Sequence, residues 1–270
     1  MTMFSSLGAH QPLIVLEEGL ESLVSAAAII LVLLAPAVAT AQDGFSGQYA
    51  IAGSAGDGAY GGNAAVAVSG SAFDVSWARD SQPLVRGFGI ARNRVLGVGY
   101  WPAGAPQDLD LGVVIYHIDG GKLDGIWLPQ GAQKSEPGHE VLIGSPDLTG
   151  RFQIALGVNP NGRSNYTGHA DFEREGDHFK ITWHAPRQVF LGSGLKIGDV
   201  LVVAYAFEHF PAVAAYCANG QDLRGSWWSG ESGAGGTETL TPAPSDMPRA
   251  SGSLPSAAND PCVTPIAAAF

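Results

Sequence analysis

The sequence predicts an all-β protein in which an antiparallel up-and-down meander occurs twice in tandem, forming one or two coiled barrels. Three observations predict it. Short runs alternate apolar and polar residues at period two, which is the spacing of a half-buried strand. Turn residues rich in Gly, Asn and Asp separate these runs, and helical spacing is absent after residue 41. The same motifs also occur twice in the same order.

The strands are predicted by apolar triplets. Residues 73–77 (FDVSW) and 179–183 (FKITW) each place three apolar side chains on one face. Because the connections between successive runs are short, neighbouring strands must be antiparallel. Gly97 and Gly99 alternate along a strand, as Gly87 and Gly89 do along the one before it, which indicates strong coiling or close approach of backbone. Coiling favours closed barrels over a flat sandwich, since closure removes exposed edges.

The duplication is clearest at its end, where YHIDGGKLDGIW (116–127) corresponds to YCANGQDLRGSW (216–227). Each unit covers roughly 80 residues and predicts six or seven strands. The predicted organisation is a first repeat at 42–128, a linker at 129–147 that contains at most one edge strand, a second repeat at 148–228, and an irregular tail rich in Pro, Ser and Ala at 229–270.

Residues 1–41 have the features of a signal peptide. An apolar stretch at 26–35 is followed by the small-residue sequence Ala39-Thr40-Ala41. The preceding segment is acidic, unlike a typical signal, so an uncleaved anchor and a misassigned start codon are the alternatives. We expect an exported protein, periplasmic or extracellular, without a membrane span in the mature chain.

The two cysteines, Cys217 and Cys262, predict one disulfide that would tie the tail to the second repeat in an oxidising compartment. The alternative is two independent thiols.

The net charge of −11 and the scattered distribution of 14 Lys and Arg residues argue against a nucleic-acid partner, which requires a basic surface. The hydrolase, zinc, Walker and dinucleotide-binding motifs are absent from the sequence. We therefore predict no metal and no cofactor.

The order of the repeated motifs resembles that of the meander barrels of the calycin group, the avidin-like and lipocalin-like proteins. The motifs are, in order, G-x-Y, Y-x-G, F-x-V-x-W, G-x-G, L-x-V, Y and D-G-x-L-x-G-x-W. The resemblance covers residues 47–127 and 150–227. The tandem arrangement is similar to an uncharacterised group of exported bacterial β-proteins. The resemblance implies a barrel interior that holds a ligand.

The candidate ligand-binding residues are aromatic side chains that recur in both halves. They either form the core of each unit or line an apolar pocket if a barrel mouth is open. The set is Trp77, Tyr100, Tyr116 and Trp127, repeated as Trp183, Tyr205, Tyr216 and Trp227. Two further tryptophans without counterparts, Trp101 and Trp228, face the other way and indicate a contact surface.

One position differs between otherwise equal halves, because His117 corresponds to Cys217. If the protein is an enzyme, Tyr116, His117 and Asp119 are the candidate acid–base residues. His169 and Asp171 could form a polar pair on one strand, but an outward, solvated face is the favoured interpretation of these two residues.

The leading functional hypothesis is a non-enzymatic binding protein that holds a small apolar or amphipathic ligand, or a partner protein, by its barrel mouths and aromatic surface. The alternatives are a cofactor-independent cyclase or isomerase and a structural envelope component. Equal pockets in both halves would favour binding, whereas a polar cluster in one half alone would favour catalysis.

Overall fold

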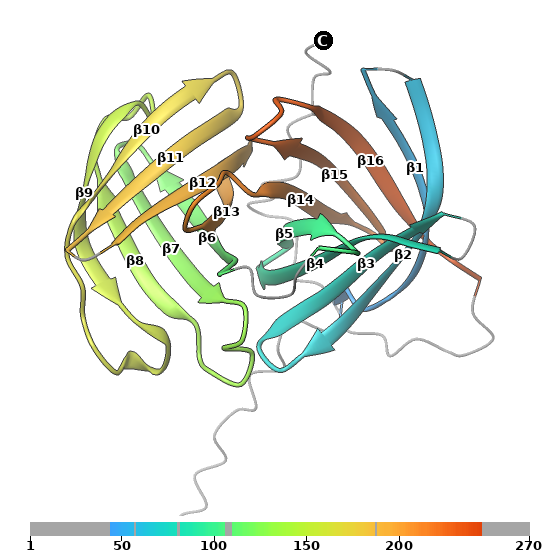
Figure 1. The fold of residues 1–270 in the computed structure, drawn as a ribbon, viewed down its shortest axis with the longest axis horizontal. Coiled ribbons are helices and arrows are strands. Elements are labelled where there is room, and N and C mark those ends of the chain that lie inside the picture. The colour runs from blue at the N-terminus through green and yellow to red at the C-terminus, as the bar shows by residue number, and fades with distance from the viewer. Residues whose placement is uncertain (1–43, 57, 80–81, 106–109, 187, 245–270) are drawn as a thin grey trace, which may run out of the picture. The chain divides into compact units, whose positions relative to one another are not determined.

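The computed structural model describes residues 44–56, 58–79, 82–105, 110–186 and 188–244. These residues form sixteen strands and a short 3-10 helix, η2 (Pro160–Gly162). The strands make two closed antiparallel barrels, so the predicted all-β meander fold is confirmed (Figure 1).

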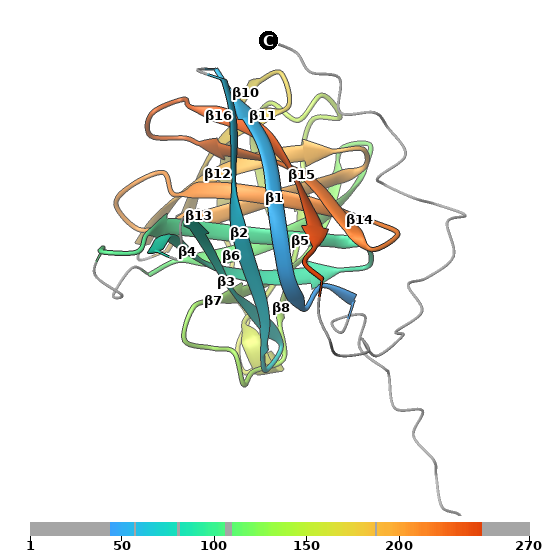
Figure 2. The same cartoon turned by 90° about the vertical axis from the view of Figure 1, so that its right-hand side faces the viewer.

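The first barrel, called barrel 1 here, combines strands from the two ends of the described chain (Figures 1 and 2). Its strands are β1 (Gly47–Ala55), β2 (Gly58–Ser69), β3 (Ala72–Arg79), β4 (Gln82–Arg92), β5 (Val95–Pro102), β14 (Ala212–Asn219), β15 (Asp222–Ser229) and β16 (Gly235–Pro242). The antiparallel pairing of β5 with β14 and of β1 with β16 closes the circle.

Barrel 2 is a contiguous segment inserted between β5 and β14. Its strands are β6 (Gly112–Asp119), β7 (Lys122–Pro129), β8 (Gly138–Ile143), β9 (Gly150–Val158), β10 (His169–Glu175), β11 (His178–Ala185), β12 (Gln188–Ile197) and β13 (Val200–Ala206). It closes where β13 pairs with β6.

Each barrel therefore takes strands from both sequence repeats. The first repeat supplies β1–β5 to barrel 1 and β6–β7 to barrel 2, and the second repeat supplies β9–β13 to barrel 2 and β14–β15 to barrel 1. The exchange resembles a domain swap within one chain, because β14–β15 occupy in barrel 1 the places that β6–β7 occupy in barrel 2.

Two strands lie where the sequence predicts a linker and an irregular tail. β8 falls in the predicted linker, and β16 falls in the segment whose overall composition indicates no regular structure. Locally, however, Thr237, Thr239 and Thr241 alternate with Glu238 and Leu240, and β-branched residues fit a pleated strand. Pairing with β1 and β15 satisfies both edges of β16 and completes barrel 1.

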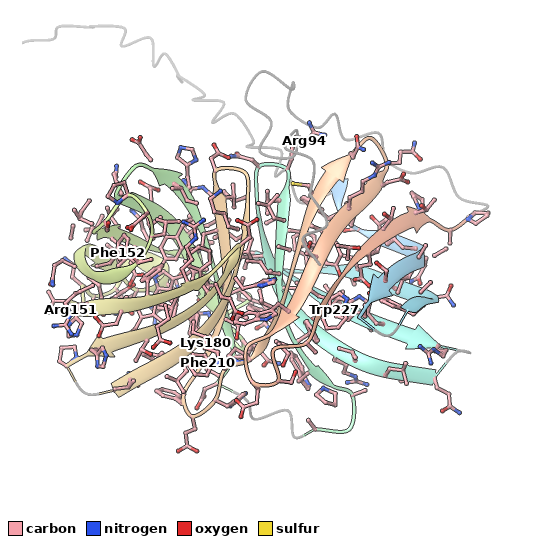
Figure 3. The ribbon with its side chains drawn as sticks, turned by 90° about the horizontal axis from the view of Figure 1, so that it is seen from above. Arg94, Arg151, Phe152, Lys180, Phe210 and Trp227 are labelled. Carbon is pink, nitrogen blue, oxygen red and sulfur yellow. The ribbon has the colours of Figure 1, made fainter. Side chains whose placement is uncertain are left out.

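Alternation along each strand separates a packed interior from an outer face. Arg151 and Phe152 are neighbours on β9, and the structure places the first in solvent and the second, fully buried, inside barrel 2 (Figure 3). Each barrel has its own interior cluster of apolar side chains.

A third apolar cluster packs the outer faces of the two barrels against each other. It contains Val95 and Ile115, and also the unpaired tryptophans Trp101 and Trp228, so the contact surface expected for these rings lies within the molecule. Gly97 on β5 lets the barrels approach closely, because a Cβ there would lie 2.5 Å from Cγ1 of Val202 on β13.

The predicted signal peptide lies outside the described residues. Cys217 is buried on β14, but Cys262 lies beyond residue 244, so the disulfide remains a prediction. Within the described ranges, no helix has the length and hydropathy needed to cross a membrane.

Replacing Gly97 by Val tests the contact between the barrels. The added side chain would collide with Val202 and Ile115, and overpacking of this kind costs about 1–3 kcal/mol. Urea unfolding should show the loss as a lower midpoint. Gly104→Ala is the control, because no atom lies within 4 Å of the added Cβ, and its effect should stay within about 0.5 kcal/mol. Equal midpoints for wild type and Gly97→Val would contradict this packing.

Candidate ligand site in barrel 2

All eight predicted aromatic residues belong to the interior clusters of the barrels or pack against them. They divide equally, with Trp77, Tyr100, Tyr216 and Trp227 in barrel 1 and Tyr116, Trp127, Trp183 and Tyr205 in barrel 2. Each group of four draws on both repeats, because the strands are exchanged.

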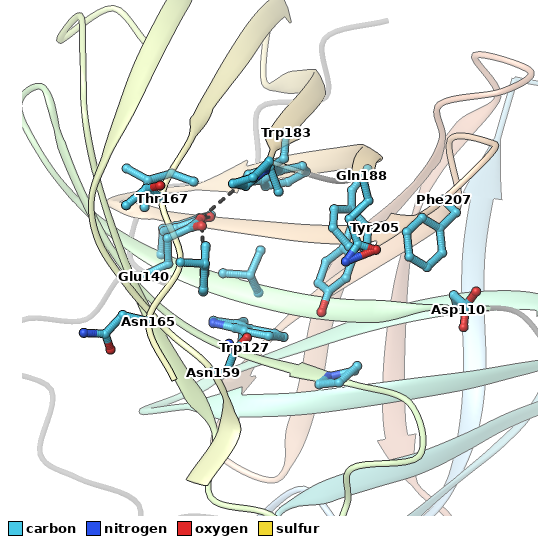
Figure 4. Close-up of a pocket in the computed structure, with 18 of the residues that line it drawn as sticks. Asp110, Trp127, Glu140, Asn159, Asn165, Thr167, Trp183, Gln188, Tyr205 and Phe207 are labelled. Atoms are coloured by element: carbon cyan, nitrogen blue, oxygen red, sulfur yellow. Dashed lines mark hydrogen bonds between the residues drawn. The ribbon is translucent and has the colours of Figure 1, made fainter. Parts of the chain in front are cut away.

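Barrel 2 contains a cavity of about 820 Å³, and all four of its predicted aromatic residues line it (Figure 4). The remaining lining is mainly apolar and aromatic, with a few polar groups. It comprises Asp110, Val114, Pro129, Gln130, Glu140, Ile154, Asn159, Asn165, Tyr166, Thr167, Ala185, Pro186, Gln188, Phe190 and Phe207.

Glu140 on β8 is the buried charge of this cavity, with only 4 % of its surface exposed. Its Oε1 accepts hydrogen bonds from the Tyr116 hydroxyl and, at 3.2 Å, from Nε1 of Trp183. Its Oε2 accepts one from the Tyr166 hydroxyl at 2.9 Å. Figure 4 shows the carboxylate below the indole of Trp183. Since a buried carboxyl without partners is strongly unfavourable, these three donors are what permit it here.

Barrel 1 contains the same arrangement around Glu238 on β16. Its Oε1 accepts from the Tyr216 hydroxyl and from Nε1 of Trp77 at 3.2 Å, and its Oε2 accepts from the Tyr60 hydroxyl at 2.9 Å. We call each set, a glutamate with two tyrosines and a tryptophan, the carboxylate cluster of its barrel. The polar cluster is thus present in both halves.

The two glutamates were not among the residues predicted from the sequence. The signal that reveals them is a further repeated motif, G-x-E-x-L, which occurs at residues 138–142 and again at 236–240. It was hidden because it lies in the predicted linker and tail. Tyr60 and Tyr166 occupy equivalent positions in the two repeats but have no feature that distinguishes them from core tyrosines.

Burial is the main influence on the protonation of Glu140. Removal from water raises the pKa of this carboxyl, and the hydrogen bonds from Tyr116, Tyr166 and Trp183 act in the opposite direction. Burial, followed by the charge of Glu140, in turn raises the pKa of the Tyr116 and Tyr166 hydroxyls, so both remain protonated donors at neutral pH.

Tyr205 joins the rings of the cavity. Its centroid lies 6.3 Å from that of Trp127, 6.1 Å from Trp183 and 5.7 Å from Phe190. Within the described part of the chain, its buried hydroxyl has no hydrogen-bond partner, and neither does Oε1 of Gln130. Both residues contribute to the lining of the cavity, but these two polar atoms have almost no accessible surface, so they lie within the wall and do not face the cavity.

The alternative catalytic residues do not converge. Tyr116 points into barrel 2 and is fully buried, whereas His117 points outward and lies 3.3 Å from Asp199. Asp119 is exposed at the end of β6. Alternation along β6 explains the separation, since successive side chains occupy opposite faces.

On the outer face of barrel 2, His169 and Asp171 form the polar pair considered above, with Nε2 3.7 Å from Oδ2. His184 on β11 joins them, and the three side chains offer ligand atoms that lie within 4.8 Å of one another. Arg151, however, donates to both oxygens of Asp171 at 2.9 and 3.1 Å. This cluster therefore has an internal cation, and such exposed ion pairs contribute little to stability.

Fold and site together define a class: a double meander-barrel protein with a buried carboxylate cluster in each barrel. Comparison of the chain with protein-family models, with curated proteins and with solved structures gave no match.

Glu140→Gln tests the protonation of the carboxylate cluster. Because the folded-state pKa lies above the unfolded value of 4.5, the folded protein retains a proton that the unfolded chain loses as the pH rises from 4.5 towards the folded pKa. The free energy of unfolding of the wild type should therefore fall across this window, and the variant should lack this component. Urea titrations between pH 4 and 7 measure it. The assignment is wrong if the difference in free energy of unfolding between wild type and variant is constant with pH. It is also wrong if the wild type becomes more stable relative to the variant as the pH rises.

Proposed function

We propose that this is an exported binding protein that holds a small apolar or amphipathic ligand in barrel 2. The observation that carries the proposal is the cavity of about 820 Å³, lined by aromatic rings and containing one buried carboxyl. Ligand sites are typically concave and mainly apolar, have volumes of ~300–1,000 Å³ and contain a few placed polar groups.

The architecture supports this proposal. Eight strands close into a barrel just wide enough to hold one small ligand, as in the lipocalins and streptavidin. The two barrels are consistent with a calycin-like meander, the family that the sequence resembles, and in this reading the aromatic residues of barrel 2 are the ligand contacts. Export depends on residues 1–41 acting as a signal peptide.

The repetition of the carboxylate cluster supports binding over catalysis. A catalytic group needs to be present only at the reacting site, whereas Glu140 and Glu238 have equivalent partners in the two barrels. The shared cluster is best explained as part of the barrel interior, which the cavity of barrel 2 then exposes to a ligand.

One observation favours an isomerase or cyclase as a second candidate. Glu140 and Tyr116 form a buried, hydrogen-bonded pair at the cavity wall, and burial raises the pKa of this carboxyl, which is the direction that general acid–base catalysis by a carboxyl requires. Under this hypothesis Glu140→Gln would abolish conversion of a bound molecule while leaving its affinity largely unchanged. The binding hypothesis instead predicts that the ligand is released chemically unaltered.

Binding can be tested with the neutral fluorescent probe N-phenyl-1-naphthylamine. We expect saturable binding that Ile154→Trp weakens by at least about tenfold, equivalent to about 1.4 kcal/mol, because Ile154 lines the cavity and an indole would fill it. Ile51→Trp places the same change at the equivalent position of barrel 1 and is the matched control, which should retain binding. Native mass spectrometry of protein purified from its own host should also reveal a retained small molecule. Absence of saturable binding, or equal binding by both variants, would overturn the proposal.

A further inference from the structure

The charged residues that line the cavity in barrel 2 are all acidic. Among the described residues that line it, Glu140 and Asp110 are acidic and none is Lys, Arg or His. A carboxylate or phosphate ligand would therefore meet no opposite charge there, and Glu140 would repel it. A ligand with a positive group would compensate the buried carboxylate.

The hydrogen bonds of Glu140 leave room for one more donor. A carboxylate offers about four acceptor positions on its two oxygens. In barrel 2, Oε1 accepts two hydrogen bonds and Oε2 accepts one, so Oε2 retains a free position. Because Glu140 lines the cavity, a ligand N–H group or ammonium can approach it from within the barrel.

The aromatic walls provide a second site of attraction for positive charge. Trp127 contacts Tyr166 edge-to-face at 5.9 Å between centroids, and both contribute to the lining together with Trp183 and Tyr205. The face of an indole or phenol attracts ammonium groups, most strongly when water is excluded.

From these features we infer that the ligand of barrel 2 is an organic cation, an amphipathic amine or quaternary ammonium compound, whose positive end lies between Glu140 and the aromatic walls. This inference rests on the proposed function, because it names the chemical class of the ligand for the same cavity. It predicts selection by charge rather than by apolar surface alone.

Barrel 1 provides a matched control within the same chain. Glu238 has the same three donors, but Nε1 of Trp227 also donates to the Tyr60 hydroxyl at 2.7 Å. In barrel 2 the equivalent Trp127 instead donates to the backbone oxygen of Val158 at 3.2 Å.

The experiment compares three ligands by displacement of N-phenyl-1-naphthylamine. Benzyltrimethylammonium is the cation, neopentylbenzene is its neutral isostere with carbon in place of nitrogen, and 3-phenylpropanoate is the anion. On the wild type we expect the cation to displace the probe at a concentration at least about tenfold lower than the neutral isostere, and the anion to be weakest. Glu140→Gln should remove the preference for the cation, and Glu238→Gln should retain it.

The possible outcomes distinguish the failure of the inferred ligand class from the failure of the proposed function. If the neutral isostere displaces the probe as well as the cation does, the ligand class is wrong while the binding site stands. If the probe itself does not bind, the proposed function fails. Because the comparison of isosteres uses the wild type, it remains valid even if a variant does not fold, and urea unfolding checks the folding of both variants.

Discussion

The structure depends on one interaction: a buried carboxylate that joins strands contributed by the two repeats. In barrel 2, Glu140 on β8 and Tyr116 on β6 lie on one side of the repeat boundary, and Tyr166 and Trp183 lie beyond it. Barrel 1 has the reverse arrangement, because its glutamate comes from the end of the chain. Since a buried carboxyl is costly without its donors, each cluster stabilises the closed barrel by holding together strands from both repeats.

The exchange also explains the glycines of β5. If these glycines served only the coiling of β5, a Cβ added at Gly97 or Gly99 would not meet side chains of the other barrel. Here a Cβ on Gly97 would meet Val202, and one on Gly99 would lie 3.0 Å from the Cβ of Ala204, both on β13 of the other barrel. The chain crosses between the barrels after β5 and returns after β13, so these strands are also the ones at which the barrels must pack. Small residues on β5 therefore set the distance between the barrels.

The sequence predicts most of the fold and half of the site, and the division has a physical reason. Alternation is a local property, so the triplets at 73–77 and 179–183 predicted strands and inward-facing tryptophans correctly. Strand partners are a non-local property. Nothing in the pattern of β5 distinguishes pairing with β6 from pairing with β14, since both have a similar apolar face. Glu140 was missed because a carboxylate on a short strand indicates a solvent-facing position unless its tyrosine and tryptophan donors are known.

The two carboxylate clusters have equivalent donors but differ in the hydrogen bonds that surround them. In barrel 1 an additional indole donor, from Trp227, reaches the tyrosine beside the carboxylate and extends the hydrogen-bond network. In barrel 2 the corresponding indole donates to the backbone, and the Tyr205 hydroxyl has no partner among the described residues. The carboxylates of the two barrels nevertheless have equivalent donors, and the carboxylate of barrel 2 lines a cavity. In barrel 2 the accessible acceptor is therefore the carboxylate of Glu140, whose Oε2 accepts only one hydrogen bond from the protein.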